Sequence, residues 1–456
     1  MRWLAVTAIL LAPGCASIPT AGDGFEDRLL ATIPEEWDVD NSDSRIFFSP
    51  DGRSVAYVVQ RVEKDPMNPT YFVVVNGRRE RDVARVGSHS GMCGFCGHGL
   101  PSFTPEGGRF AYAYRVGTDE KGREAVMIGG QSGPFFDDVS DPVFTRDGRR
   151  FAYEAEEKGR EFVVFDHQPQ GREYDKAEHP VFSADGRRTA YRAFTLGEPD
   201  EDGERPIRSA FIVVDGVKGR EFDWVGWPVF HPDGDVAYEA KKDGVHRVMK
   251  GAAPVTQSYD YVGDLAFSPD GRRMAFVARI GGRYRVVADG KELKAEFESV
   301  ANPFFSPDGR RVAYTGMRDT MIVGEDLPPI FDSNGRECMV VDQEPGEDCS
   351  FIYEPRFGPD GRLVYTMNQG NDWFVVHGRE KFGKGYEDVG DPAVSPDGSR
   401  FAFVASQGEE TFVVCGNQRS ASFDYVRSPV FSPDGKRIGF GARKGRELWW
   451  KVMEVK

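Results

Sequence analysis

The sequence predicts an all-β protein, a β-propeller built from about ten four-stranded antiparallel blades. Three observations predict this fold. A turn motif, Ser-Pro-Asp-Gly in its fullest form, recurs ten times; apolar, strand-forming residues flank each copy; and the copies lie 37 to 55 residues apart. A period near 40 residues is typical of a propeller blade, whereas helical repeats would need a 3.6-residue apolar period that this chain lacks.

Each copy of the motif predicts a tight hairpin turn. Proline presets the backbone φ of the second turn position, aspartate can accept a hydrogen bond from its own backbone, and glycine tolerates the left-handed conformation. The turn acids are Asp51, Glu106, Asp147, Asp185, Asp233, Asp270, Asp308, Asp360, Asp397 and Asp434.

Each repeat is expected to hold four strands. The first ends at the turn, the second carries one aromatic residue at a fixed place, the third is of the Phe-Val-Val type, and a polar residue with glycine turns into the fourth. We expect the aromatic residues of the second strands to pack between sheets rather than to bind a ligand. They are Tyr57, Tyr112, Tyr153, Tyr191, Tyr238, Phe276, Tyr314, Tyr365, Phe403 and Phe440.

The two ends of the repeat array predict how the ring closes. The last repeat ends with Leu448 to Val455 and supplies only three strands, while Glu36-Trp37-Asp38-Val39 resembles the later fourth-strand segments. We expect this early segment to complete the last blade. No linker marks a boundary in mid-chain, so we prefer one ring; two smaller propellers are the alternative, because propellers usually have about four to eight blades.

The N-terminal residues predict export. Arg2 and the apolar run Trp3 to Ala12 are too short for a mature membrane span and are typical of a signal peptide. The following Ala12-Pro13-Gly14-Cys15 resembles the lipobox of bacterial lipoproteins, with Ala12 where that family usually has leucine. The resemblance implies a lipid anchor on Cys15; an ordinary signal peptide is the alternative. The expected organisation is a signal peptide (1–14), a lipidated tether (15–30) and the propeller (31–456).

Composition narrows the classes of partner. The chain has 456 residues and a net charge of −15, with no basic cluster able to neutralise a run of phosphates, so nucleic acid is excluded as a partner. A repeat architecture allows this length in one domain, because each unit packs only on its neighbours.

The repeated frame Pro-x-Phe-Ser-Pro-Asp-Gly-x-x-x-Ala-Tyr resembles the WD40-like propeller repeat of TolB, the periplasmic component of the Tol-Pal system, and of the propellers that precede some serine peptidases. The resemblance implies a scaffold rather than an activity. TolB has an additional N-terminal domain, for which there is no room between Cys15 and Asp51. The peptidases need a C-terminal α/β domain, whereas this sequence ends four residues after Val452. Both differences argue against transferring either function.

Four long insertions predict a binding face. In a TolB-like propeller the extra residues at 61–70, 86–100, 195–206 and 316–334 would all lie on one face of the ring, where variable loops usually bind partners. Harmless loop growth is the alternative. The candidate binding residues are Asp65, Asn68, Tyr71, His89, Phe95, His98, Asp200, Asp202, Arg205, Arg318, Asp319 and Asp326.

The second insertion is rich in possible ligands. His89, Cys93, Cys96 and His98 have a spacing that suits zinc, and a Cys-x-x-Cys pair can also exchange disulfides. Outside the cytoplasm a structural Cys93–Cys96 disulfide is the preferred interpretation.

The remaining cysteines lie late in the chain. Cys338 and Cys349 flank a hairpin turn at Glu344-Pro345-Gly346, which predicts a second disulfide across adjacent strands. Cys415 is left over and, by comparison with Asn76, Asp215, Asp289 and His377, is expected near the surface; a buried small hydrophobe is the alternative.

No catalytic motif and no cofactor site emerge from the sequence. We therefore expect a non-catalytic cell-envelope lipoprotein, on the outer membrane or the periplasmic side, that binds an envelope protein or a cell-wall component through its propeller. The alternative is a propeller-type hydrolase or lyase acting on an envelope polysaccharide or peptide, with acids or histidines near the ring's axis.

Overall fold

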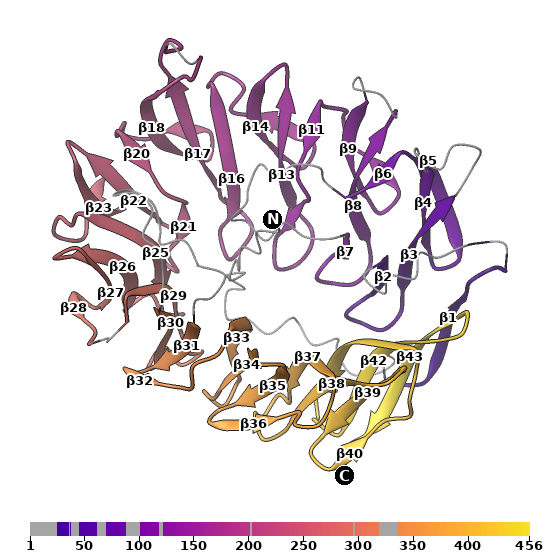
Figure 1. Ribbon diagram of the computed structural model, residues 1–456. Coiled ribbons are helices and arrows are strands. Elements are labelled where there is room, and N and C mark those ends of the chain that lie inside the picture. Colours follow the sequence, from indigo (N-terminus) through magenta and orange to yellow (C-terminus); the bar gives the residue numbers. More distant parts are fainter. Residues whose placement is uncertain are drawn as a thin grey trace.

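The computed structural model describes residues 25–35, 37, 45–61, 70–87, 101–117, 122–200, 203–294, 297–318 and 336–456. These residues are all-β, and their strands form nine sheets. Eight sheets of four or five strands are single blades, while a nine-stranded sheet holds two blades joined by one parallel pairing, Glu161 with Lys176. The ten blades follow one another around a single ring, which confirms the predicted propeller (Figure 1).

The first five blades occupy the first part of the ring. Blade 1 comprises β2 (Ile46–Phe48), β3 (Val55–Arg61), β4 (Thr70–Val75) and β5 (Arg78–Val83). Blade 2 comprises β6 (Arg85–Val86), β7 (Ser102–Phe103), β8 (Phe110–Val116), β9 (Arg123–Ile128) and β10 (Gln131–Ser132). Blade 3 comprises β11 (Asp138–Val139), β12 (Val143–Phe144), β13 (Phe151–Glu157), β14 (Arg160–Phe165) and β15 (Gln168–Gln170). Blade 4 comprises β16 (Lys176–Phe182), β17 (Thr189–Leu196), β18 (Ile207–Val214) and β19 (Val217–Lys218). Blade 5 comprises β20 (Trp224–Val225), β21 (Val229–Phe230), β22 (Val236–Lys242), β23 (Val245–Lys250) and β24 (Ala253–Pro254).

The other five blades return to the starting point. Blade 6 comprises β25 (Tyr261–Phe267), β26 (Met274–Ile280), β27 (Arg283–Ala288) and β28 (Lys291–Glu292). Blade 7 comprises β29 (Ser299–Phe305), β30 (Val312–Arg318), β31 (Arg336–Val341) and β32 (Glu344–Pro345). Blade 8 comprises β33 (Phe351–Phe357), β34 (Leu363–Gln369), β35 (Asp372–His377) and β36 (Glu380–Phe382). Blade 9 comprises β37 (Asp388–Val394), β38 (Phe401–Gln407), β39 (Glu410–Cys415) and β40 (Gln418–Arg419). Blade 10 comprises β41 (Tyr425–Phe431), β42 (Arg437–Lys444), β43 (Glu447–Glu454) and β1 (Arg28–Thr32).

The first strand of each blade lies innermost and the fourth lies outermost (Figure 1). Because the strands of a blade are antiparallel, the first-to-second and third-to-fourth turns share one rim, which we call the turn rim. The second-to-third connections and the connections between blades share the opposite rim, which we call the loop rim.

The recurrent turn forms as predicted. In blade 7 the amide of Gly309 donates to the carbonyl of Ser306 (2.8 Å), and Gly309 has a φ of 70°. The Ser306 hydroxyl donates to Asp308 Oδ1 (2.6 Å), and the same oxygen accepts from the amide of Arg310 (3.0 Å). These hydrogen bonds hold the pKa of Asp308 below its usual range.

An arginine after each of several turns links its blade to the next one. Arg311 donates through Nη1 to the carbonyl of Gly361 in the turn of blade 8 (2.9 Å), and its Nε lies 2.7 Å from Asp342 Oδ2 in its own blade. Equivalent links to a turn glycine come from Arg109, Arg150, Arg188, Arg273, Arg362 and Arg400. These hydrogen bonds therefore link neighbouring blades at the turn rim around much of the ring.

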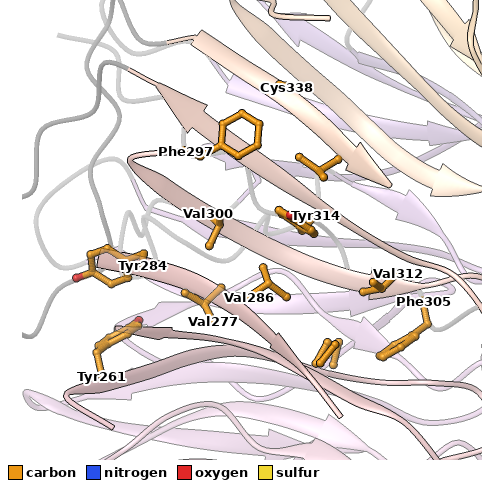
Figure 2. Close-up of a cluster of buried hydrophobic side chains, with 14 residues drawn as sticks. Tyr261, Val277, Tyr284, Val286, Phe297, Val300, Phe305, Val312, Tyr314 and Cys338 are labelled. Atoms are coloured by element: carbon orange, nitrogen blue, oxygen red, sulfur yellow. The ribbon is translucent and has the colours of Figure 1, made fainter. Parts of the chain in front are cut away.

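The core lies between the blades. All ten aromatic residues predicted to pack there are buried, with at most 5% of their surface exposed. Figure 2 shows one such cluster, in which Tyr314 and Val312 of blade 7 pack against Val277 and Val286 of blade 6. Burial of this kind in every interface is what holds neighbouring sheets face to face.

The ring closes through its first and last strands, as predicted, but by a different segment. β1 pairs antiparallel with β43 and completes the four strands of blade 10. This strand lies upstream of the segment beginning at Glu36 that was expected there, and its first residues belong to the stretch expected to be a tether. Trp37 instead packs its ring edge-on against Phe72 of blade 1, with centroids 5.1 Å apart.

The predicted disulfide between Cys338 and Cys349 is not formed, and both are free, buried thiols. Cys349 lies opposite Glu337 in the sheet, so the two thiols are offset by one residue and lie on opposite faces of the blade. They accordingly join different core clusters, one towards blade 6 and the other towards blade 8.

Cys415 is buried rather than near the surface. Val414 pairs with Phe403 in the same way that Val213 pairs with Tyr191, which makes Cys415 the equivalent of Val214 and not of the turn residue Asp215. A one-residue shift in the comparison of the repeats caused the wrong prediction.

Candidate functional site

The loop rim carries the predicted binding residues that the structure describes. Asp200 and Arg205 share the loop between β17 and β18, whereas Tyr71 lies on β4 and Arg318 ends β30. They therefore come from three blades and do not converge on one point. The other predicted residues, Asp65, Asn68, His89, Phe95, His98, Asp202, Asp319 and Asp326, lie outside the described residues, as do Cys15, Cys93 and Cys96.

The described residues of this group also stabilise the rim itself. Asp200 Oδ1 accepts a hydrogen bond from the amide of Glu204 (2.8 Å), and Arg205 Nη1 lies 3.0 Å from Asp175 Oδ1. The guanidinium of Arg318 lies 4.7 Å above the ring of Phe297. These contacts hold the loop ends in place on a rigid scaffold.

Four exposed apolar side chains lie at the same rim, at different places around the ring. Val116 ends a second strand, Ile207 begins a third strand, Phe351 begins a first strand and Phe135 lies in a connection between blades. Each exposes between 37% and 43% of its surface. All four positions belong to the loop rim because of the antiparallel order within a blade.

A second candidate region lies on the inner wall of the ring. In six first strands a β-bulge places one residue at a φ between 46° and 56°, a conformation that is strained for residues other than glycine. These residues are His179, Asp264, Asn302, Glu354, Asp391 and Ser428. Trp227 of blade 5 stands at the equivalent position between Gly226 and Pro228. Strain repeated at one place around an inner wall is typical of functional positions.

Side chains at these inner-wall positions reach the next blade. Asp264 Oδ2 accepts from the amide of Asn302 (2.9 Å), and Asp391 Oδ2 accepts from the amide of Ser428 (3.0 Å). The rings of His179 and Trp227 lie 4.8 Å apart. The inner wall is therefore continuous across several blades.

Three successive blades carry a charge where the other blades do not. The residue after the buried aromatic is Glu154, Arg192 and Glu239 in blades 3, 4 and 5. In the other blades it is Val58, Ala113, Val277, Thr315, Thr366, Val404 and Gly441. Glu154 and Glu239 expose only 6% and 7% of their surface, and burying a charge costs free energy unless it is compensated. Comparison of this position among the ten repeats thus distinguishes blades 3, 4 and 5 from the others.

These buried charges are built into the inner wall. Glu154 Oε1 accepts from the amide of His179 (2.8 Å), and Arg192 Nη2 lies 2.5 Å from Glu178 Oε1. A Cβ at Gly226 would lie 1.6 Å from Glu239 Oε2, so only glycine allows this carboxyl its place beside Trp227.

Glu239 has an unusual acidity. Burial, with a smaller contribution from the nearby charge of Asp264, raises the pKa of Glu239 to about 7, against the opposing effects of its own backbone amide, the Leu265 amide and Arg192. Asp264 itself is exposed to solvent although protein surrounds it closely, as expected on a concave wall. We call Trp227, Glu239 and Asp264 the inner-wall site.

The inner-wall site was not predicted. This site carries neither a catalytic motif nor a long loop; its signal is the identity of the residue after the aromatic, compared from repeat to repeat. Within the described part of the chain, no group of three or more His, Cys, Asp or Glu side chains is arranged to hold a metal ion. No helix among the described residues is long and apolar enough to cross a membrane.

Comparison with known proteins finds only solved structures of low similarity. No protein-family model matches it, and no curated protein matches it. Among solved structures, TolB from Acinetobacter baumannii is 16% identical, with 78% of this chain and 81% of that chain covered and a TM-score of 0.29. A puromycin-hydrolyzing peptidase from Mycobacterium tuberculosis is 18% identical, with 75% and 61% covered and a TM-score of 0.37. The β-propeller domain of the Trilobed protease from Pyrococcus furiosus is 13% identical, with 82% and 95% covered and a TM-score of 0.29.

Proposed function

We propose that this chain is an exported cell-envelope lipoprotein, anchored through Cys15, whose ring is a non-catalytic scaffold that binds an envelope protein or a cell-wall component. The observation that carries the proposal is the loop rim, where exposed apolar side chains stand beside the ends of the long connections. Apolar side chains exposed together on a rigid surface favour a protein partner. The lipid anchor follows from the lipobox resemblance and would hold the ring near a membrane.

Crosslinking in intact cells, followed by identification of the captured proteins, tests the binding role. Ile207→Ser and Phe351→Ser should each reduce the captured partner, because each removes an exposed apolar contact at the loop rim. Val217→Ser is the matched control, since Val217 is 70% exposed on the turn rim. Equal capture by all variants, or no captured partner at all, would count against the proposal.

The anchor has its own test. Cells grown with a radiolabelled fatty acid should label the full-length protein but not its Cys15→Ser variant, which should appear in the soluble fraction. Label that persists in the variant would contradict lipid attachment at this residue.

A hydrolase or lyase is the second candidate function. Glu239, with a pKa of about 7, and Asp264, whose pKa burial also raises, offer two carboxyl groups on the inner wall that could exchange protons, as general acid–base catalysis needs. Incubation with peptidoglycan and envelope polysaccharides, followed by mass spectrometry, would detect such an activity. It should be lost in Glu239→Gln, and a lack of any cleaved product would exclude this candidate for those substrates.

A further inference from the structure

The inner-wall site holds two carboxyl groups whose ionised forms are not balanced by cations of their own blades. Arg192, the cation that acts on Glu239, is already engaged by Glu178 at 2.5 Å, and Lys176 binds the other oxygen of Glu178 at 3.0 Å. Asp264 accepts only the backbone amide of Asn302 among the hydrogen bonds described for it. Among the described residues, no cation is therefore paired with Glu239 and Asp264 alone.

An exposed indole belongs to Trp227, the residue that follows Gly226, and the Glu239 carboxyl lies against Gly226. Trp227 exposes 40% of its surface, although His179 packs against its ring at 4.8 Å. Glu239 is reached through Gly226, the residue directly before Trp227, and Asp264 follows at the equivalent position of the next blade. The π-face of an aromatic ring beside carboxylates attracts a cation and does not favour binding of an anion.

We propose that the inner-wall site binds a lysine or arginine side chain from a basic segment of a partner protein. The inference rests on the proposed binding role of the ring and names the chemistry of the partner. The ammonium or guanidinium would lie over Trp227 and pair with Asp264 and Glu239, supplying the missing positive charge. The net charge of −15 on the whole chain favours the approach of such a segment over long range.

Proton linkage gives this interaction a distinctive signature. The charged groups that act on Glu239 are Arg192 of β17 and Asp264 of β25, with Tyr261 of β25 also close. A bound cation stabilises the carboxylate of Glu239 and lowers its pKa from about 7. Binding should therefore release protons near neutral pH and become tighter as the pH rises from about 6 to about 8.

The test uses a fluorescein-labelled hexa-arginine peptide and the folded mature protein, with binding followed by fluorescence anisotropy. The double variant Glu239→Gln with Asp264→Asn should weaken binding about ten-fold, and Trp227→Leu should weaken it by a similar factor. The control double variant Asp372→Asn with Glu409→Gln removes the same two charges from exposed positions of blades 8 and 9. It should change binding less than two-fold.

Three results would overturn the proposal. The first is an equal loss in the inner-wall and control variants, which would mean non-specific attraction to an acidic protein. The second is unchanged peptide binding in Trp227→Leu while its thermal unfolding matches the wild type. The third is a neutral disaccharide, N,N′-diacetylchitobiose, that binds at the site while the peptide does not, which would assign the site to a saccharide.

The failure of this inference can be told apart from the failure of the binding role. If crosslinking in cells captures a partner equally well with Trp227→Leu and with the wild type, the inner-wall site is not the contact, although the ring still binds. If neither protein captures a partner while the hexa-arginine peptide binds as expected, the site stands and the proposed envelope role fails.

Discussion

Trp450 occupies the space that a side chain at Gly52 would need, since a Cβ added there would lie 2.2 Å from Cε2 of the indole. Gly52 belongs to the first turn of blade 1, and Trp450 belongs to β43, the third strand of blade 10 and the last strand in the sequence. The contact therefore joins the two ends of the blade series at the point where the ring closes.

Gly52→Ala should reduce the free energy of unfolding by about 1–3 kcal/mol more than Gly361→Ala, because forced overpacking adds to backbone strain. Gly361 is a matched control: it stands in the same turn of blade 8 with a φ of 75°, but a Cβ there would meet no atom within 4 Å. Urea unfolding measures both variants. Equal losses would show that the indole moves aside without cost.

Arg311→Met should destabilise the protein by about 1–3 kcal/mol, because it removes a charged donor to the Gly361 carbonyl and leaves Asp342 with only the Val312 amide as a donor. Arg310→Met is the control, since Arg310 exposes 86% of its side chain and lies 3.9 Å from Asp308. Thermal unfolding compares the two. A loss as small as that of the control would mean that the arginine links contribute little.

Glu337→Gln should change how stability depends on pH. Burial raises the pKa of Glu337 to about 7, although its Oε2 accepts the amide of Ile352 (2.8 Å). The folded protein therefore binds a proton more tightly than the unfolded chain, and stability falls as the pH rises from about 4.5 to about 7. The variant should lose this slope and gain up to about 2–3 kcal/mol relative to the wild type at pH 8.

Urea unfolding at pH 5 and at pH 8 checks the expectation for Glu337. The Glu409→Gln variant, at an exposed position in blade 9, should keep the wild-type difference between the two pH values. A Glu337→Gln protein with the same difference would show that the carboxyl is ionised without cost in the fold.

The three described cysteines should resist alkylation until the protein unfolds. Cys338, Cys349 and Cys415 are buried, and burial raises the pKa of Cys338 to about 11, which leaves little reactive thiolate at neutral pH. Iodoacetamide labelling before and after denaturation, without reductant, should mark all three only in the denatured sample. A Cys338–Cys349 bridge would leave both unlabelled even then.

The ten turns and the aromatic core were predictable because each depends on local chemistry that recurs in the sequence. Ser306, Asp308 and Gly309 make the predicted turn bonds with each other and with the adjacent backbone. The closing strand was harder to place, because Arg28–Thr32 carries none of the repeat's motifs and is held there by the open edge of β43.

The disulfide predicted between Cys338 and Cys349 and the inner-wall site both depend on information that the repeat pattern of the sequence does not contain. Whether Cys338 and Cys349 face each other depends on a one-residue register that the hairpin length leaves undetermined. Glu239 and Asp264 lie in different repeats, and their proximity follows only from the packing of one blade on the next. The exposure of Trp227 likewise depends on the curvature of the whole ring.

Six of the outermost strands, β10, β19, β24, β28, β32 and β40, are only two residues long. A second molecule that approached from the side would find too few free amides and carbonyls there to extend a sheet. The circumference of these six blades is thereby protected against polymerisation into fibrils, even where the protein is crowded. Other molecules are therefore expected to bind at the two rims or in the interior of the ring.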